Sequence, residues 1–189
     1  MITDTDRAMW FGASDVKYII AKNRNTATFK KWWLEKLGYT KSNFSNKYTI
    51  AGTNYEHRIL DALEVPGLRK DTQVRIENLR LRVNLDGDTE TDIFEVKTFK
   101  ADKKFNSKQY IPQVQVQMFT TGKRNAYIIA YPLEEYDYKN LFNEIDREKI
   151  LKIPVEYDSD FIEKVFLPNL MYLKECLIKG IMPTKYIAA

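Results

Sequence analysis

Residues 80–98 have the sequence RLRVNLDGDTETDIFEVKT, and this pattern predicts two short β-strands joined by a tight turn. Apolar residues alternate with polar ones over residues 81–85, and a second apolar run marks residues 93–96. Residues 87–92 between them are rich in Gly, Asp and Thr, which favour turns and oppose strand continuation. We therefore expect a β-hairpin in this part of the chain.

Three charged side chains fall within the predicted hairpin, where a buried sheet disfavours charge. Glu95 and Lys97 are two residues apart, so they project from one face of the second strand while Val96 points to the core. If the strands pair, Asp86 at the end of the first strand comes close to Glu95. Two carboxylates and a lysine at one point can bind a hard divalent cation and hold a water molecule beside it. A solvated face with a cross-strand ion pair explains this stretch equally well.

Chain length and composition limit the class of protein. A chain of 189 residues is long enough for one domain with a substantial core, so we expect a single domain over residues 1–189. No stretch of about 18 apolar residues is present, and the first residues lack the basic and then apolar order of a signal peptide. These features predict a cytoplasmic protein with no membrane partner.

Cys176 and His57 are the only cysteine and the only histidine in the sequence. A single cysteine excludes a disulfide within the chain, a cysteine zinc site and an iron–sulfur cluster. A single histidine argues against a histidine-rich metal site, so carboxylates are the expected metal ligands. We interpret His57 as a surface or capping residue. The net charge of +4 is consistent with a polyanionic partner.

The N-terminal segment places Arg7 ahead of a predicted helix start at Ser14. Ser14 suits the N-cap of a helix whose buried face includes residues 16–20, and capping is the favoured role for this residue. A helix N-terminus with a serine hydroxyl can also bind a phosphate that Arg7 could reach. Arg24 follows in a basic polar stretch. A second helix is expected over residues 26–36, with its aromatic side chains in the core.

Two further helices carry polar residues that are candidates for a site. A helix is expected over residues 51–63, after a polar, mobile loop over residues 39–48, and Glu56 lies near the edge of its apolar face. Most glutamates in such a place only border the core. A helix that starts near Tyr110 and stops at Gly122 places Gln113 on one face with Gln117. These glutamines can provide solubility, or can bind phosphate oxygens or a water molecule beside a metal.

The remaining elements complete the predicted order along the chain. Strands are expected over residues 72–77, 125–131 and 150–157, and a long amphipathic helix over residues 160–180. Helices, a strand meander, a helix, two strands and a helix predict an α/β fold with a central mixed β-sheet flanked by helices.

Together these elements resemble the PD-(D/E)XK nuclease superfamily, and within it lambda exonuclease and the YqaJ-like phage recombination nucleases. The resemblance is carried by residues 84–87, by Glu95-Val96-Lys97, by Glu56, by Tyr110 with Gln113, and by Arg7 with residues 13–16 and 20–24. Leu85 stands where the superfamily signature has proline, which leaves the acidic residues in place. The resemblance implies a restriction-endonuclease-like core.

The resemblance also implies roles for individual residues. The metal ligands would be Glu56, Asp86, Glu95 and the Val96 carbonyl. Lys97 and Gln113 would position and activate the attacking water, and they would be catalytic residues together with Glu56, Asp86 and Glu95. The contacts to DNA and its 5′-phosphate would come from Arg7, Ser14, Arg24 and Tyr110. The implied cofactor is Mg²⁺, for which Mn²⁺ is expected to substitute.

The implied function is a Mg²⁺-dependent deoxyribonuclease, foremost a 5′→3′ exonuclease on linear double-stranded DNA in phage-type recombination. The implied partners are double-stranded DNA ends, a single-strand annealing protein and further copies of this chain in a ring-shaped trimer. Two alternatives remain open: an endonuclease on the same core, and a non-catalytic module that binds DNA ends or another protein.

Overall fold

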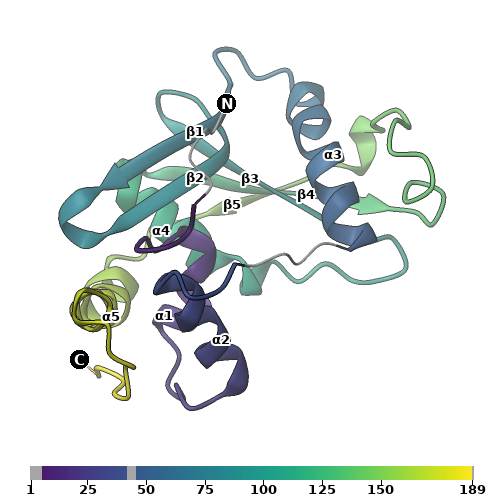
Figure 1. The fold of residues 1–189 in the computed structure, drawn as a ribbon. Helices are drawn as coiled ribbons and strands as arrows, with labels where there is room; N and C mark the ends of the chain where they lie inside the picture. The colour runs from purple at the N-terminus through teal and green to yellow at the C-terminus, as the bar shows by residue number, and fades with distance from the viewer. Residues whose placement is uncertain (1–5, 42–45, 189) are drawn as a thin grey trace.

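The computed structural model of the chain describes residues 6–41 and 46–188. A five-stranded mixed sheet with strand order β1-β2-β3-β4-β5 forms the centre, and helices cover both of its faces (Figure 1). This arrangement confirms the predicted α/β fold. Within the described ranges, no helix combines the length and the apolar composition needed to cross a lipid bilayer.

The strands are β1 (Arg69–Ile76), β2 (Leu81–Asp88), β3 (Asp92–Lys100), β4 (Asn125–Leu133) and β5 (Leu151–Val155). The α-helices are α1 (Val16–Ile19), α2 (Ala27–Lys36), α3 (Lys47–Ala62), α4 (Ile111–Thr121) and α5 (Leu167–Lys179). A π-helical segment, Phe161–Phe166, leads into α5, and a 3₁₀ turn, Ala13–Asp15, leads into α1.

Strand pairing follows from the connections between the strands. Short turns join β1, β2 and β3 into an antiparallel meander, whereas β3 and β4 are parallel and are linked through α4. A parallel pair needs such a crossover, because the chain must return to the starting edge of the sheet. The predicted hairpin is confirmed, but its turn is shorter than expected, since Gly87 and Asp88 still pair with Phe94 and Ile93 of β3.

Beyond these two pairs, β2 and β3 separate, and the N-terminal segment takes the open edge of β2. Phe11 donates its N–H to the Arg80 carbonyl and accepts from the Arg82 N–H, both at 2.8 Å. Phe11 therefore satisfies the Arg80 carbonyl and the Arg82 N–H at the edge of β2 that β3 leaves open. We call the opening bounded by β2, β3 and residues 7–14 the fork.

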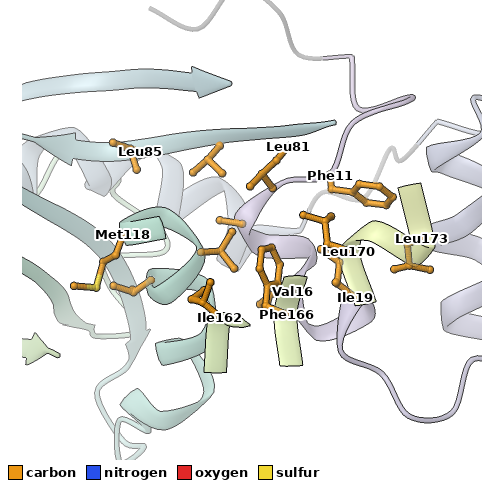
Figure 2. Packing of buried hydrophobic residues seen from close by; sticks show 14 of the residues in the cluster. Phe11, Val16, Ile19, Leu81, Leu85, Met118, Ile162, Phe166, Leu170 and Leu173 are labelled. Atoms are coloured by element: carbon orange, nitrogen blue, oxygen red, sulfur yellow. The ribbon is translucent and has the colours of Figure 1, made fainter. Parts of the chain in front are cut away.

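Two apolar clusters hold the helices against the sheet. On one face, Tyr55, Ile59 and Leu60 of α3 pack with residues such as Phe94 and Val96. On the other face, side chains from β2, α1, α4 and the C-terminal helix interlock (Figure 2). Figure 2 labels Phe11, Val16, Ile19, Leu81, Leu85, Met118, Ile162, Phe166, Leu170 and Leu173 of this second cluster.

Two helices begin differently from the sequence prediction. Helix α3 begins at Lys47 rather than at residue 51, because the Asn46 side chain caps the N–H groups of Tyr48 and Thr49 at 2.9 Å. The predicted loop therefore ends before residue 46, and its residues 42–45 lie outside the described part of the chain. The last helix has a π-helical first part, and Pro168 in the first turn of α5 has no N–H to continue an α-helical pattern.

Gly87 lets α3 approach β2 closely. A Cβ atom at this position would lie 2.9 Å from Leu60 Cδ2 and 3.2 Å from Leu68 Cδ1. Leu60 is fully buried and lies one turn of α3 after Glu56, so the same contact positions the predicted site residue on this helix.

Gly87→Ala is expected to lower the free energy of unfolding by about 1–3 kcal/mol, because the added methyl overpacks this contact. Leu60→Ala alone is expected to cost about 2–5 kcal/mol through the cavity that it leaves. In the double variant the methyl has room, so the combined loss should be smaller than the sum of the two. Urea unfolding of the three variants measures this, and strictly additive losses would contradict the close packing.

Candidate active site

A cavity of about 400 Å³ lies in the fork and collects most of the predicted site residues. Its lining includes Arg7, Ser14, Glu56, Asp86, Glu95, Lys97 and Gln113. These side chains come from the N-terminal segment, α3, β2, β3 and α4, so the fold joins five separate parts of the sequence at one point.

Asp86 occupies the place where β2 and β3 separate. Its Oδ2 accepts the Val96 N–H at 2.8 Å, so a carboxylate replaces the strand carbonyl that would otherwise bind this group. Burial raises the pKa of Asp86 well above its usual value, and the negative charges of Glu95 and Glu56 raise it further. The Lys97 ammonium and the Val96 N–H oppose this shift only in part.

Glu95 is almost fully buried and is held by three neighbours. Its Oε1 lies 2.5 Å from Lys97 Nζ and accepts a hydrogen bond from Gln113 Nε2. Its Oε2 accepts from Gln117 Nε2, whose side chain is also buried. Gln113 and Gln117 of α4 therefore orient the Glu95 carboxylate, and buried Gln117 does not serve solubility.

Lys97 is the positive charge among these carboxylates. Burial alone would lower the pKa of Lys97, but the carboxylates of Glu95 and Asp86 outweigh burial and raise it above the usual value. Its Nζ also lies 5.2 Å from the centre of the Tyr110 ring. Tyr110 therefore lies beside the Lys97 side chain and does not line the cavity.

Glu56 reaches the cavity from α3, on the side opposite to α4. Burial and the charge of Glu95 raise the pKa of Glu56. Carboxylates whose pKa values are raised by one another repel when ionised, and a divalent cation between them would relieve that repulsion. Oxygen donors of this kind suit Mg²⁺, so Glu56, Asp86 and Glu95 fit the predicted cofactor.

Glu56 also belongs to a second group of candidate ligands, with His57 and Asp71. Their ligand atoms lie within 4.8 Å of one another, and His57 Nε2 is 3.2 Å from Asp71 Oδ1. His57 is exposed, as the sequence predicted. Asp71 was not predicted to take part in a site, since its approach depends on the pairing of β1 with β2.

The N-terminal segment brings Arg7 to Ser14. Arg7 Nη2 lies 3.3 Å from Ser14 Oγ and 3.1 Å from Asp15 Oδ1, so the Asp15 carboxylate aims the guanidinium. The predicted N-cap role of Ser14 is wrong: Asp15 Oδ2 accepts the Gly12 N–H at 2.8 Å, and the Ser14 hydroxyl is exposed towards the cavity. A carboxylate satisfies this turn better than a hydroxyl because it carries charge.

Asp15 is the centre of a buried ion pair beneath the cavity. Its Oδ2 lies 2.5 Å from Lys36 Nζ, and its Oδ1 accepts from Trp32 Nε1 at 2.9 Å. Burial alone would raise the pKa of Asp15, but the charges of Lys36 and Arg7 outweigh burial and hold that pKa below its usual value. The pair connects residues 7–15 to α2 and so keeps Arg7 and Ser14 in place.

Arg24, like Tyr110, is a predicted DNA contact that does not line the cavity. Its side chain is buried, and its guanidinium donates to the Ile19 carbonyl at 2.9 Å, to Asn169 Oδ1 at 2.7 Å and to the Lys185 carbonyl. These bonds fasten the C-terminal residues to α5 and the N-terminal segment. A guanidinium used in this way inside the protein is not free to meet a phosphate.

Trp10 and Arg82 are among the residues of the cavity wall that were not predicted. Arg82 could have been found from the alternation of β2, because it shares a face with Asn84 and Asp86. Trp10 gave no such signal, since it belongs to an irregular segment whose direction depends on the distant strand β2.

Asp15→Asn is expected to lower the free energy of unfolding by about 3–5 kcal/mol at pH 7, because Lys36 is left buried without its counter-charge. The lowered pKa of Asp15 stabilises the fold above about pH 4, the range of an unfolded aspartate, and this contribution is lost as the pH falls through the folded-state pKa. Urea unfolding between pH 3 and pH 8 should therefore show that the free energies of unfolding of wild type and Asp15→Asn converge at acid pH. Equal stability at pH 7 would contradict the role of the pair.

Asp86→Asn is expected to raise the free energy of unfolding in chelator at pH 7, by about 1–4 kcal/mol. An acid whose pKa is raised by folding destabilises the folded state above its unfolded pKa, and asparagine removes this cost while keeping an acceptor for the Val96 N–H. Asp102→Asn, at an exposed aspartate, is the matched control and should change little. Destabilisation by Asp86→Asn would show that charge repulsion is not the dominant effect here.

The family described as YqaJ-like viral recombinase domain matches residues 5–124, which include every residue discussed for the cavity. A search among curated proteins found no match.

Solved structures share the fold at low sequence identity. The alkaline exonuclease LHK-Exo from Laribacter hongkongensis is 19% identical, with a TM-score of 0.64 over 92% of this chain and 94% of that one. LHK-Exo in complex with dAMP gives a TM-score of 0.63 at the same identity and the same coverage. A phage-related exonuclease from Haemophilus somnus 129PT is also 19% identical, with a TM-score of 0.63 over 90% of this chain and 96% of that one.

Proposed function

Because the chain belongs to the YqaJ-like viral recombinase domain family, within the PD-(D/E)XK superfamily, we propose that it is a Mg²⁺-dependent exonuclease of double-stranded DNA. It degrades linear duplexes in the 5′→3′ direction during phage-type recombination, and residues 1–189 act as one nuclease domain. The observation that carries this proposal is the convergence of Asp86, Glu95 and Lys97 in a cavity that also holds Arg7 and Ser14. The shared fold with a protein crystallised with dAMP supports a nucleotide product.

The cofactor would be held by carboxylates at the fork. Asp86, Glu95 and Glu56 are its side-chain ligands, and the Val96 carbonyl completes the set from β3. A bound Mg²⁺, or Mn²⁺ in its place, supplies electrostatic stabilisation for the charge that develops on the phosphate.

Lys97 and Gln113 prepare the attack on the phosphodiester. Both side chains contact the same oxygen of Glu95, so their polar ends are held together beside the carboxylates. From there they orient the water that attacks phosphorus as the bond to the leaving oxygen breaks, and the Lys97 ammonium offsets negative charge on the phosphate oxygens. Tyr110 supports the Lys97 side chain from behind.

Dependence on a DNA end follows from Arg7 and Ser14. Their side chains converge at 3.3 Å on one wall of the cavity, where they would bind the terminal 5′-phosphate. Closed circular DNA offers no such phosphate. The proposed partners are therefore double-stranded DNA ends, together with a single-strand annealing protein and the ring-shaped homotrimer that the family resemblance implies.

Two substrates test the function: a linear 5′-phosphorylated duplex and a covalently closed circle, each with Mg²⁺ or with chelator. The proposal predicts that only the linear duplex is degraded, and only when Mg²⁺ is present. Cutting of the circle would instead establish an endonuclease on the same core. Binding without cleavage of either substrate would establish a non-catalytic DNA-binding module.

Lys97→Ala is expected to slow degradation of the linear duplex by about 10²–10⁴-fold, the usual contribution of a positioned acid–base group. Glu95→Gln should reduce cleavage to background, because it removes a ligand charge while keeping the shape of the side chain. Glu90→Gln, at an exposed glutamate in the turn between β2 and β3, is the matched control. Product release is measured in Mg²⁺, and turnover by Glu95→Gln at the rate of the control would overturn the site assignment.

A further inference from the structure

The cavity has a basic aromatic wall that the proposed cleavage chemistry does not use. Trp10 lines the cavity, and guanidinium groups from Arg75, Arg80 and Arg82 lie 5.6, 5.8 and 5.9 Å from the centre of its rings. We call Trp10 and these three arginines the Trp10 cluster.

Neighbouring contacts hold the Trp10 cluster in a defined place. Phe11, the next residue, is hydrogen-bonded to the backbones of Arg80 and Arg82, which sets Trp10 against the start of β2. Arg75 of β1 faces Arg82 of β2 in the pairing of the two strands. The cluster therefore belongs to the β1–β2 hairpin, and its position relative to Asp86 is determined by the same strand.

The direction of β2 leads from the Trp10 cluster to the catalytic carboxylates. Arg82, Asn84 and Asp86 are two residues apart, so their side chains lie on one face of this strand. All three line the cavity. Asn84 is exposed, and its Oδ1 accepts from Gln73 Nε2 at 2.9 Å. A strand of DNA that reaches Asp86 therefore has the Trp10 cluster beside it.

Trp10 differs from the other tryptophans of the chain. Trp32 and Trp33 are 4% and 0% exposed and pack in the aromatic part of the core, as the sequence predicted. Trp10 is only partly buried and stands in the cavity wall. Nucleic acids are bound by this combination of groups, because bases stack on aromatic rings and guanidiniums attract phosphates.

We propose that the Trp10 cluster is a DNA-binding subsite that adjoins the cleavage site. The indole of Trp10 contacts the base of the terminal nucleotide, whose phosphate lies at Arg7 and Ser14 on either side of Trp10 in the sequence. Arg82, which is buried and donates to the Asp6 carbonyl, holds the indole from within the protein, whereas the more exposed Arg75 and Arg80 attract the DNA backbone. This inference rests on the proposed function and adds a residue that grips the base without taking part in the chemistry.

Tryptophan fluorescence gives a direct readout, because the other two tryptophans are buried. The full-length protein is titrated in chelator, where no cleavage occurs, with the linear 5′-phosphorylated duplex, and binding is followed in parallel by anisotropy of labelled DNA. We expect quenching of wild-type fluorescence on binding and no quenching in Trp10→Phe. Trp10→Ala should weaken binding about 5- to 150-fold, the factor that corresponds to one lost base-stacking contact.

Controls separate a binding role from a structural one. Trp10→Phe keeps an aromatic ring and should retain most of the wild-type affinity, whereas Phe142→Ala, at an aromatic residue that is 80% exposed elsewhere, should bind as wild type. In Mg²⁺, Trp10→Ala should raise KM and leave kcat within a few-fold. Arg75→Gln, at an exposed residue, should lower the slope of log affinity against log salt by about one.

Three results would count against the subsite. Unchanged affinity of Trp10→Ala would overturn it, and so would quenching that persists in Trp10→Phe, because the signal would then come from elsewhere. Wild-type protein that neither binds nor degrades the duplex would overturn the proposed function itself. DNA that is degraded normally by wild type and by Trp10→Ala, with equal KM, would remove only the subsite.

Discussion

The fork between β2 and β3 is the constraint on which the rest of the structure depends. Where two strands separate, their backbone groups lose their partners, and each one that is left buried without a hydrogen bond destabilises the fold. Here Phe11 binds the freed edge of β2, and the Asp86 carboxylate binds the freed N–H of Val96. Because the Asp86 carboxylate takes the place of a neighbouring strand, a negative charge lies at the centre of the protein. The Lys97 ammonium offsets this charge only in part.

The N-terminal segment is accordingly part of the site. It closes one side of the fork through Phe11, it carries Arg7 and Ser14, and it is tied to α2 by the buried pair of Asp15 and Lys36. Arg24 also joins separate segments, since its guanidinium connects the end of α1 with the C-terminal residues. Buried charged groups therefore hold segments together at Asp15 and at Arg24. At the fork, the pair of Glu95 and Lys97 holds the proposed catalytic groups.

Sequence patterns predicted the parts of this arrangement that are local. Alternation gave the hairpin, turn chemistry and Gly122 gave the end of α4, and the charged residues within the hairpin pointed to Asp86, Glu95 and Lys97. Features that depend on distant partners were missed or misread. Ser14 looked like a cap because the competing carboxylate of Asp15 binds the turn only when Lys36 and Arg7 compensate its charge. Trp10 could not be oriented before its strand partner was known.

The central claim is that the carboxylates of the fork bind a divalent cation, and calorimetric titration with Mn²⁺ tests it most directly. The competing group of Glu56, His57 and Asp71 makes the comparison sharp, because Glu56 belongs to both sets. Wild type and His57→Ala should bind the ion alike, whereas Asp86→Asn should lose binding. Equal binding by wild type and Asp86→Asn, or loss in His57→Ala alone, would contradict the account and place the ion outside the fork.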